Sequence, residues 1–220
     1  MKKTKRITII SGHYGSGKTN IAVNLAIDVK KQFDKVAVAD LDIVNPYFRT
    51  KDSIREFEAN GIRLISSEYA GSNVDIPALP QEMYAITDDK SYKVIVDLGG
   101  DDRGALALGR LTPEILAEND YEMLLVVNKF RPLTPDLEST VEVAREIEYA
   151  GKIKFTGIIN NSNLGDFTTE EDVLGSVEYA QEIAQAMGIP IKFTSVKADL
   201  YERLKNDIEN IYPLELQAKI

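Results

Sequence analysis

The chain has 220 residues, of which 44% are apolar and 28% are charged, as expected for a globular protein with a substantial core. Its formal net charge is −9, and its Lys and Arg residues are scattered among acidic ones, which argues against nucleic acid as a partner. With no cysteine and one histidine, the chain cannot form disulfides, Cys-ligated clusters, a Cys nucleophile or a His-rich metal site.

The N-terminal stretch MKKTKRITII is basic and then apolar, but it lacks the small-residue cleavage site of a signal peptide. We interpret its apolar part as a first strand. No apolar run approaches the roughly 20 residues that span a bilayer. The C-terminal stretch NDIENIYPLELQAKI is neither basic nor a long amphipathic helix. We therefore expect a cytoplasmic protein with no membrane partner.

Short apolar runs alternate with longer segments of helical periodicity along the chain. The runs are rich in Val and Ile and mostly unbroken, as in a parallel sheet covered on both faces. They lie at residues 6–11, 36–40, 62–66, 93–98, 123–128, 155–160 and 190–194. The alternation predicts an α/β fold with a doubly wound, mostly parallel sheet. Because there is no repeat and no Gly/Ser-rich linker, we expect one domain over residues 1–220.

The two clearest predicted helices follow the later strands. The first, TPDLESTVEVAREIEYAG, opens on Thr134 and a proline and closes at Gly151. The second runs from about 169 to 187, with Thr168 and Glu171 spaced as a capping box at its start. Gly188 and a proline two residues later predict its end.

The stretch SGHYGSGKTN, residues 11–20, contains the pattern G-x-x-x-x-G-K-[ST]. A strand precedes it and a helix is predicted to follow, which is the context of a phosphate-binding loop rather than of a chance Gly-rich turn. The glycines allow a tight turn whose backbone N–H groups face the phosphates. The residues expected to contact a nucleotide are Gly12, His13, Tyr14, Gly15, Ser16, Gly17, Lys18, Thr19 and Asn20. Lys18 would reach the β- and γ-phosphates, and the Thr19 hydroxyl would bind Mg²⁺.

Two acidic motifs end predicted strands further along the chain. Asp40 and Asp42 follow the strand at 36–40, at the edge where α/β sheets bind ligands. Either carboxylate could orient a water or hold Mg²⁺ through its hydration shell, although Asp40 could equally order the loop that follows. Asp97 ends the strand KVIVDL, as the Mg²⁺-binding aspartate of a Walker B site does.

The residues after Asp97 extend this second motif. Asp97-Leu98-Gly99-Gly100 has the form D-x-x-G, in which a glycine N–H can sense the γ-phosphate. The following Asp101, Asp102 and Arg103 have two interpretations: a solvated turn, or a turn in which Arg103 stabilises charge in the same chain or across a dimer.

Asparagines cluster at the end of the strand FTGIIN, at Asn160, Asn161 and Asn163. An asparagine offers both a donor and an acceptor and can therefore bind the edge of adenine. The alternative is a polar turn after a strand, a position that asparagine favours in any case.

Together and in this order, the phosphate loop, ADLDIVN, VDLGG and GIINNSN resemble the MinD/ParA and nitrogenase-iron-protein class of P-loop ATPases, the CobQ/CobB/MinD/ParA group. The resemblance covers most of the chain and implies a P-loop NTPase fold with bound ATP and Mg²⁺. It implies that Asp42 handles the attacking water, that Thr19, Asp42 and Asp97 hold the metal, and that Asn161 contacts adenine. Lys18, Asp42 and Asp97 are then the catalytic residues.

One position departs from the pattern of this family. Where the family has a signature lysine that reaches across a nucleotide-sandwich dimer, this chain has His13, followed by Tyr14. In one interpretation a nearby triphosphate raises the pKa of His13, and the imidazolium partly replaces the lysine. In the other, His13 and Tyr14 pack as an ordinary cover of the loop and no such homodimer forms.

Three functions are compatible with these motifs. The first is an ATP-hydrolysing switch that engages a protein partner when Mg·ATP orders segments 40–49 and 97–103. The second is a small-molecule kinase or ligase of the dethiobiotin-synthetase type, with an acceptor pocket formed by Tyr47, Arg49 and the loop 67–80. The third is a nucleotide-binding module with little turnover. ATP is favoured over GTP because the guanine motif N-K-x-D is absent: Asn128-Lys129 is followed by Phe-Arg.

Overall fold

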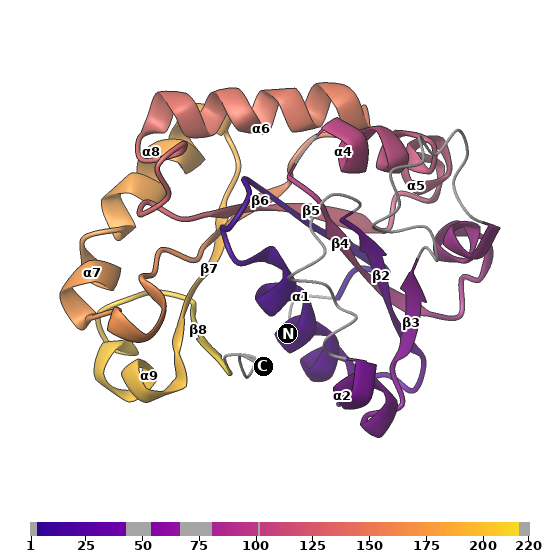
Figure 1. Cartoon of the computed structure of the whole chain (residues 1–220), viewed down its shortest axis with the longest axis horizontal. Helices are drawn as coiled ribbons and strands as arrows, with labels where there is room; N and C mark the ends of the chain where they lie inside the picture. The colour runs from indigo at the N-terminus through magenta and orange to yellow at the C-terminus, as the bar shows by residue number, and fades with distance from the viewer. Residues whose placement is uncertain (1–3, 43–53, 67–80, 101, 216–220) are drawn as a thin grey trace.

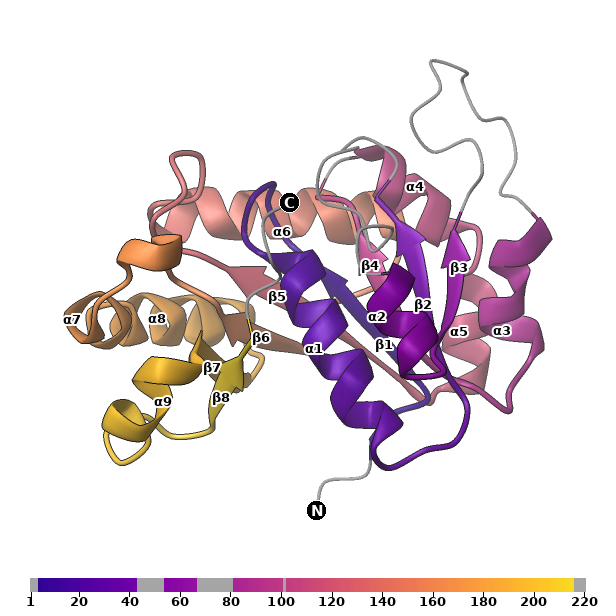
Figure 2. The same cartoon turned by 60° about the horizontal axis from the view of Figure 1, so that its bottom comes forward.

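A computed structural model of the chain describes residues 4–42, 54–66, 81–100 and 102–215. Within these residues, eight strands form one sheet in the order β3-β2-β4-β1-β5-β6-β7-β8. Every neighbouring pair is parallel. Helices lie above and below the sheet (Figures 1 and 2). The predicted α/β doubly wound architecture is confirmed.

The strands match the predicted apolar runs closely. They are β1 (Ile7–Ser11), β2 (Val36–Leu41), β3 (Arg63–Ser66), β4 (Lys93–Leu98), β5 (Tyr121–Val127), β6 (Gly157–Asn160), β7 (Ile191–Lys197) and β8 (Ile211–Leu214). Residues of β1, β2 and the end of β4 are buried without interruption, as expected where helices cover both faces of a sheet. The eighth strand was not predicted.

Helices divide between the two faces of the sheet. They are α1 (Lys18–Lys30), α2 (Ile54–Ala59), α3 (Ala85–Asp88), α4 (Asp102–Gly109), α5 (Thr112–Glu118), α6 (Leu137–Gly151), α7 (Glu170–Leu174), α8 (Val177–Met187) and α9 (Ala198–Leu204), with short 3₁₀ turns at Gln81–Tyr84 and Gly165–Phe167. Helices α3 to α6 and α8 share one apolar core with the sheet, whereas α1 and α2 build a second core on the opposite face. A smaller core joins α7 and α9 to β7.

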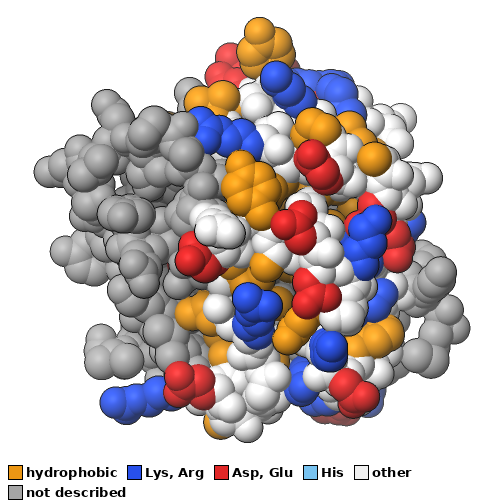
Figure 3. Space-filling view, turned by 90° about the vertical axis from the view of Figure 1, so that its right-hand side faces the viewer, with side chains coloured by type: hydrophobic (Ala, Val, Ile, Leu, Met, Phe, Trp, Pro, Cys, Tyr) orange, Lys and Arg blue, Asp and Glu red, His pale blue; other side chains and the backbone are white. Residues whose placement is uncertain are grey.

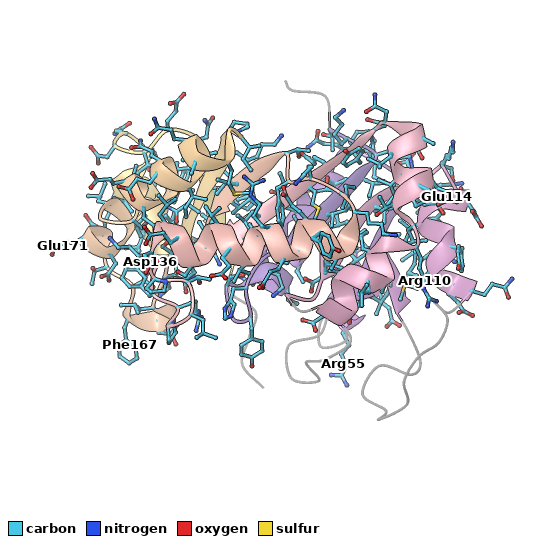
Figure 4. The ribbon with its side chains drawn as sticks, turned by 90° about the horizontal axis from the view of Figure 1, so that it is seen from above. Arg55, Arg110, Glu114, Asp136, Phe167 and Glu171 are labelled. Carbon is cyan, nitrogen blue, oxygen red and sulfur yellow. The ribbon has the colours of Figure 1, made fainter. Side chains whose placement is uncertain are left out.

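The starts of two helices differ from their predictions. The capping box of α7 is formed by Thr169 and Asp172, one residue later than the predicted pair Thr168 and Glu171. The predicted helix 169–187 is also divided into α7 and α8. Helix α6 begins after Asp136, whose carboxylate accepts a hydrogen bond from a backbone N–H in the first turn, and not at Thr134 (Figure 4). The predicted ends at Gly151 and Gly188 are confirmed.

Strand β8 is tied to the helix that follows the phosphate loop. The side-chain amide of Asn24 in α1 accepts from the backbone N–H of Glu215 at 3.0 Å and donates to its carbonyl oxygen at 3.0 Å. The Tyr212 hydroxyl donates to a carboxylate oxygen of Asp28, also in α1, at 2.5 Å. These bonds hold the last strand against α1.

Acidic and basic side chains are interspersed on the described part of the face shown in Figure 3. This mixture agrees with the scattered Lys and Arg residues in the sequence. Among the described residues, no helix is both long enough and apolar enough to cross a membrane.

The sheet order brings the functional motifs together. β1 lies in the middle of the sheet between β4 and β5, and β2 is the next strand beyond β4. In the register of these strands, Asp97 lies beside Ile10 of β1 on one side and beside Asp40 of β2 on the other. The residues after β1, β2 and β4 therefore meet at one edge of the sheet.

Candidate functional site

The phosphate loop connects β1 to α1 as predicted. Gly12 has a φ of +151° and Gly17 has a φ of +93°, backbone conformations that residues other than glycine rarely adopt. A Cβ at Gly12 would lie 2.3 Å from the carbonyl oxygen of Val126 in β5, so only glycine fits there. Inside the loop, the N–H of Ser16 donates to the carbonyl oxygen of His13 at 3.1 Å. The loop is a tight turn that ends at the first residue of a helix.

The first two residues of α1 face the centre of the site. The Lys18 side chain is buried, and its Nζ donates to the carbonyl oxygen of His13 at 3.3 Å. The Thr19 Oγ1 donates to Asp97 Oδ2 at 2.7 Å. The phosphate loop and the motif at the end of β4 are therefore joined by a direct side-chain hydrogen bond.

Asp97 is fully buried at the point where these motifs meet. One of its carboxylate oxygens accepts from Thr19, whereas the other, Oδ1, is buried without a hydrogen-bond partner among the described residues. Burial and the charges of Asp40 and Asp42 raise the pKa of Asp97 to about 7, although Thr19 and Lys18 act in the opposite direction. An unpartnered buried carboxylate oxygen is suited to a cation or to water bound to one.

The two aspartates after β2 have different environments. Asp40 is buried, and its carboxylate accepts from the backbone N–H of Asp42 at 3.1 Å. This bond agrees with the interpretation that Asp40 orders the chain after the strand. Asp42 is partly buried beside it, close enough to Asp97 to raise the pKa of that residue. The roles predicted for Asp42 toward water and metal stay predictions.

The D-x-x-G segment after β4 touches the phosphate loop through its backbone. A Cβ at Gly100 would lie 2.2 Å from the carbonyl oxygen of Gly12 and 3.0 Å from the backbone nitrogen of Tyr14. Gly104, in α4, packs in the same manner against Leu41 and Gly99. The ends of β2 and β4 and the loop after β1 thus form one close-packed backbone cluster.

The asparagines at the end of β6 and just after it are all fixed by hydrogen bonds. Asn161 is buried, its Nδ2 donates to the carbonyl oxygen of Ser16 at 2.6 Å, and its Oδ1 accepts from the Ser195 hydroxyl at 2.6 Å. Asn160 donates to a buried serine, and Asn163 donates to the carbonyl oxygen of Asn161 at 2.7 Å. Asn161 therefore braces the phosphate loop, a contact that the sequence did not indicate. Its predicted contact with adenine stays a prediction.

His13 and Tyr14 behave differently from each other. Tyr14 is 59% exposed, so the expectation that both residues pack as a cover of the loop is wrong for Tyr14. The Nδ1 of His13 lies 2.9 Å from the carbonyl oxygen of Tyr14 and therefore carries the proton that it donates. Burial, together with the charges of Lys18 and Arg131, lowers the pKa of His13, which keeps the imidazole neutral at pH 7. The rise in pKa expected beside a triphosphate stays a prediction.

A side chain that the sequence analysis did not select lies over the loop. A Cβ at Gly15 would lie 3.4 Å from the Cζ, Nε and Nη1 atoms of Arg131. Arg131 follows β5 and stands where the aspartate of an N-K-x-D guanine motif would be. Only the folded sheet brings it to the phosphate loop, so no local pattern could have indicated its position.

Several predicted residues lie outside the described part of the chain. These are residues 43–49 of the predicted switch segment 40–49, which include Tyr47 and Arg49, the loop 67–80 and Asp101. The backbone of Asp102 and Arg103 lies in α4, but their side chains are also outside the description.

Metal binding at this site would depend on more than protein ligands. Within the described residues, no group of three or more His, Asp or Glu side chains is arranged to hold a metal ion. Mg²⁺ is usually held by one or two carboxylates or hydroxyls together with waters and phosphate oxygens. Thr19 and Asp97, with the unpartnered Oδ1, fit such a partial ligand set.

Fold and site together define a nucleotide-binding protein with a P-loop. A profile of the CobQ/CobB/MinD/ParA nucleotide binding domain matches residues 7–206. The chain therefore belongs to this family, as the motifs indicated. A search of curated protein sequences found no match.

Solved structures with the same fold include proteins of the signal recognition system. The chain superposes on the cell division protein FtsY of Thermotoga maritima with a TM-score of 0.59 and 21% identity, covering 89% of this chain and 63% of that one. The Signal Recognition Particle 54 kDa protein of Aeropyrum pernix, in complex with GDP, superposes with a TM-score of 0.57 and 21% identity, covering 88% of this chain and 42% of that one. FtsY of Elizabethkingia anophelis, also with GDP, superposes with a TM-score of 0.54 and 18% identity, covering 89% of this chain and 58% of that one. The chain thus spans less than two thirds of these structures, and at such identities the likeness concerns the fold.

Proposed function

We propose that this protein is a Mg²⁺-dependent ATP-binding switch that hydrolyses ATP and acts on a protein partner in the cytoplasm. Membership of the nucleotide-binding family supports the general class. The absence of an N-K-x-D motif from the sequence favours ATP over GTP.

The observation that carries this proposal is the hydrogen bond between Thr19 and Asp97. A hydroxyl at the start of α1 and a carboxylate at the end of β4 meet at 2.7 Å, and the second carboxylate oxygen has no partner among the described residues. An ordinary structural aspartate would have both oxygens satisfied or exposed. The pair is instead suited to share a hydrated Mg²⁺, which when bound would neutralise phosphate charge.

The remaining roles follow from the position of each side chain around this pair. Lys18, buried at the helix start, would bind the β- and γ-phosphates and stabilise the charge that develops on them. Asp42 would orient the water that attacks the γ-phosphorus, so that ATP and water give ADP and inorganic phosphate. Backbone N–H groups of residues 12–19 would bind the phosphate oxygens.

The contact between Gly100 and the phosphate loop supports a switch. Because Gly100 lies against the backbone of Gly12 and Tyr14, a change in the loop would be passed directly to the segment after β4. Packed backbone of this kind has little freedom to absorb a shift gradually. We propose that a protein partner recognises the segments after β2 and β4 when ATP is bound.

Calorimetry tests the binding half of this proposal. Wild-type protein titrated with ATP in magnesium buffer should bind one nucleotide per chain, and Lys18→Ala should lose most of this binding. Lys30→Ala is the matched control, because Lys30 lies at the other end of the same helix, where its Nζ donates to the Asp34 carbonyl oxygen. Unchanged ATP binding by Lys18→Ala would overturn the assignment of the loop.

Hydrolysis is tested separately, as phosphate release from ATP by the protein alone over a range of protein concentrations. Turnover that rises faster than the protein concentration would indicate a homodimer in the active form. Turnover that requires an added small-molecule acceptor would contradict the switch and favour a kinase or ligase.

A further inference from the structure

The backbone of Arg131 is hydrogen-bonded within the turn that follows β5. Its backbone N–H donates to the carbonyl oxygen of Asn128 at 3.1 Å, and its carbonyl oxygen accepts from the N–H of Thr134 at 3.1 Å. The buried side chain of Asn128 accepts from the N–H of Phe130 at 3.0 Å and donates to the carbonyl oxygen of Asn163. Backbone and side-chain hydrogen bonds therefore define the turn from which the arginine side chain extends.

The guanidinium of this arginine lies against the phosphate loop. Three of its atoms are 3.4 Å from the place where Gly15 would carry a Cβ, so the group covers the face of the loop that glycine leaves open. Its charge is also close enough to His13 to lower the pKa of that residue. Both observations place a cation at the middle of the G-x-x-x-x-G-K-[ST] sequence.

This cation has unused hydrogen-bonding capacity. The Nε of Arg131 is buried and has no hydrogen-bond partner among the described residues. The ion pairs found among those residues do not include it. A buried guanidinium N–H without an acceptor is costly, and the groups that arginine binds best are phosphate and carboxylate oxygens. An anion at the loop would remove this cost.

His13 is less suited to the same task. Its pKa is lowered and its Nδ1–H is already donated to Tyr14, so the protein alone presents a neutral ring there. Lys18 and Arg131 are the cations whose charges lower the pKa of this ring.

We propose that Arg131 is a phosphate-binding residue, whose guanidinium donates hydrogen bonds to the polyphosphate of the bound nucleotide. The second cation of the site then comes from the turn after β5 of the same chain, in place of a cation at position 13. This inference rests on the proposed function, because it needs a nucleotide in the loop.

Three variants test the proposal. Arg131→Gln removes the charge, Arg131→Lys keeps the charge without the planar fork, and Lys129→Gln removes a charge from the same turn. Lys129 is exposed and donates to the carbonyl oxygen of Gly175, away from the loop, so its variant is the matched control. Each is titrated by calorimetry with MgATP, inorganic tripolyphosphate and adenosine, at two salt concentrations.

Arg131→Gln should weaken MgATP and tripolyphosphate about 10- to 100-fold, as expected for the loss of a charge-assisted hydrogen bond, and should leave adenosine unchanged. The salt dependence of MgATP binding should decrease, because one cation fewer contacts phosphate. The affinity of Arg131→Lys for MgATP and tripolyphosphate should lie between those of the wild type and Arg131→Gln. Lys129→Gln should bind both ligands as the wild type does. If Arg131→Gln lowers the unfolding temperature, the titrations of Arg131→Lys test the proposal instead. Weaker binding of MgATP and tripolyphosphate with unchanged binding of adenosine would again support it.

Two results would overturn the proposal. One is wild-type affinity for MgATP and tripolyphosphate in both Arg131 variants, which leaves the proposed function intact as long as Lys18→Ala loses binding. The other is an equal loss of adenosine binding, which would make Arg131 a structural support of the loop. Failure of the wild-type protein itself to bind ATP would remove both this inference and the proposed function.

Discussion

Replacing Asp97 by Asn is expected to stabilise the protein, and to do so more strongly at pH 8 than at pH 5. The cause is the raised pKa of about 7, which comes from burial first and from the charge of Asp40 second. Since the folded state holds this proton more tightly than the unfolded state, the wild type loses stability as pH rises from about 4 to about 7. Asn has nearly the same shape and no proton to lose.

The size of the effect follows from the shift in pKa. From 3.8 to about 7 is roughly three pKa units, and each unit corresponds to about 1.4 kcal/mol, so ionised Asp97 costs about 4 kcal/mol above pH 7. At pH 5 Asp97 is protonated in the folded protein but already ionised in the unfolded chain, and this difference lowers the free energy of unfolding by about 2 kcal/mol. The stability difference between Asp97→Asn and wild type should therefore grow by roughly 2–3 kcal/mol between pH 5 and pH 8.

Urea denaturation at pH 5, 6, 7 and 8, in buffer with EDTA and without nucleotide, measures this difference. Asp207→Asn is the control, because Asp207 is exposed and far along the chain, and its curve should stay parallel to that of the wild type. Parallel curves for Asp97→Asn and wild type over the whole range would refute the reasoning, since they would mean that Asp97 titrates alike in both states.

Three further substitutions have defined outcomes. Asn161→Ala removes the brace on the Ser16 carbonyl oxygen and should lower the free energy of unfolding by about 1–3 kcal/mol and weaken ATP binding, both visible by denaturation and calorimetry. Gly100→Ala places a methyl 2.2 Å from the Gly12 carbonyl oxygen and should abolish ATP binding; full retention would disprove the contact. Tyr179→Phe removes a buried hydroxyl bond to the start of α6 and should cost about 1–2 kcal/mol in a thermal or urea melt, whereas no change would show the bond to be unimportant.

The sequence predicted most of the sheet because its central strands are buried on both faces. A run rich in Val and Ile is a strong local signal, and most of the seven predicted strands are unbroken runs of this kind. Strand β8 escaped because it is a short edge strand that contains Pro213 and exposes part of its surface. Its place depends on bonds to α1, which lies about 190 residues earlier, and on its pairing with β7.

Helix starts were predicted less accurately than helix ends. Thr168 and Glu171 have the same spacing as the real pair, Thr169 and Asp172, so the pattern alone could not separate two adjacent registers. Gly188 was found because it adopts a left-handed conformation that glycine favours strongly.

The candidate site was predictable where its residues belong to a contiguous sequence motif, and not where the tertiary fold brings distant residues together. Gly12, Lys18 and Thr19 belong to one contiguous pattern, and Asp97 ends a strand that carries its own signal. Arg131 carries no such signal, because its relation to the loop arises only from the order of β1 and β5 in the sheet.

The bonds from Asn24 and Asp28 to the chain after β7 have a mechanical consequence. They attach the C-terminal half of α1 to the chain after β7, so this helix cannot rotate freely when a charged ligand binds at its first turn. Amide protons in the middle of α1 should therefore exchange slowly with and without ATP. Asn24→Ala removes the two bonds to Glu215 and should accelerate the exchange of these amide protons, without changing the glycines of the phosphate loop.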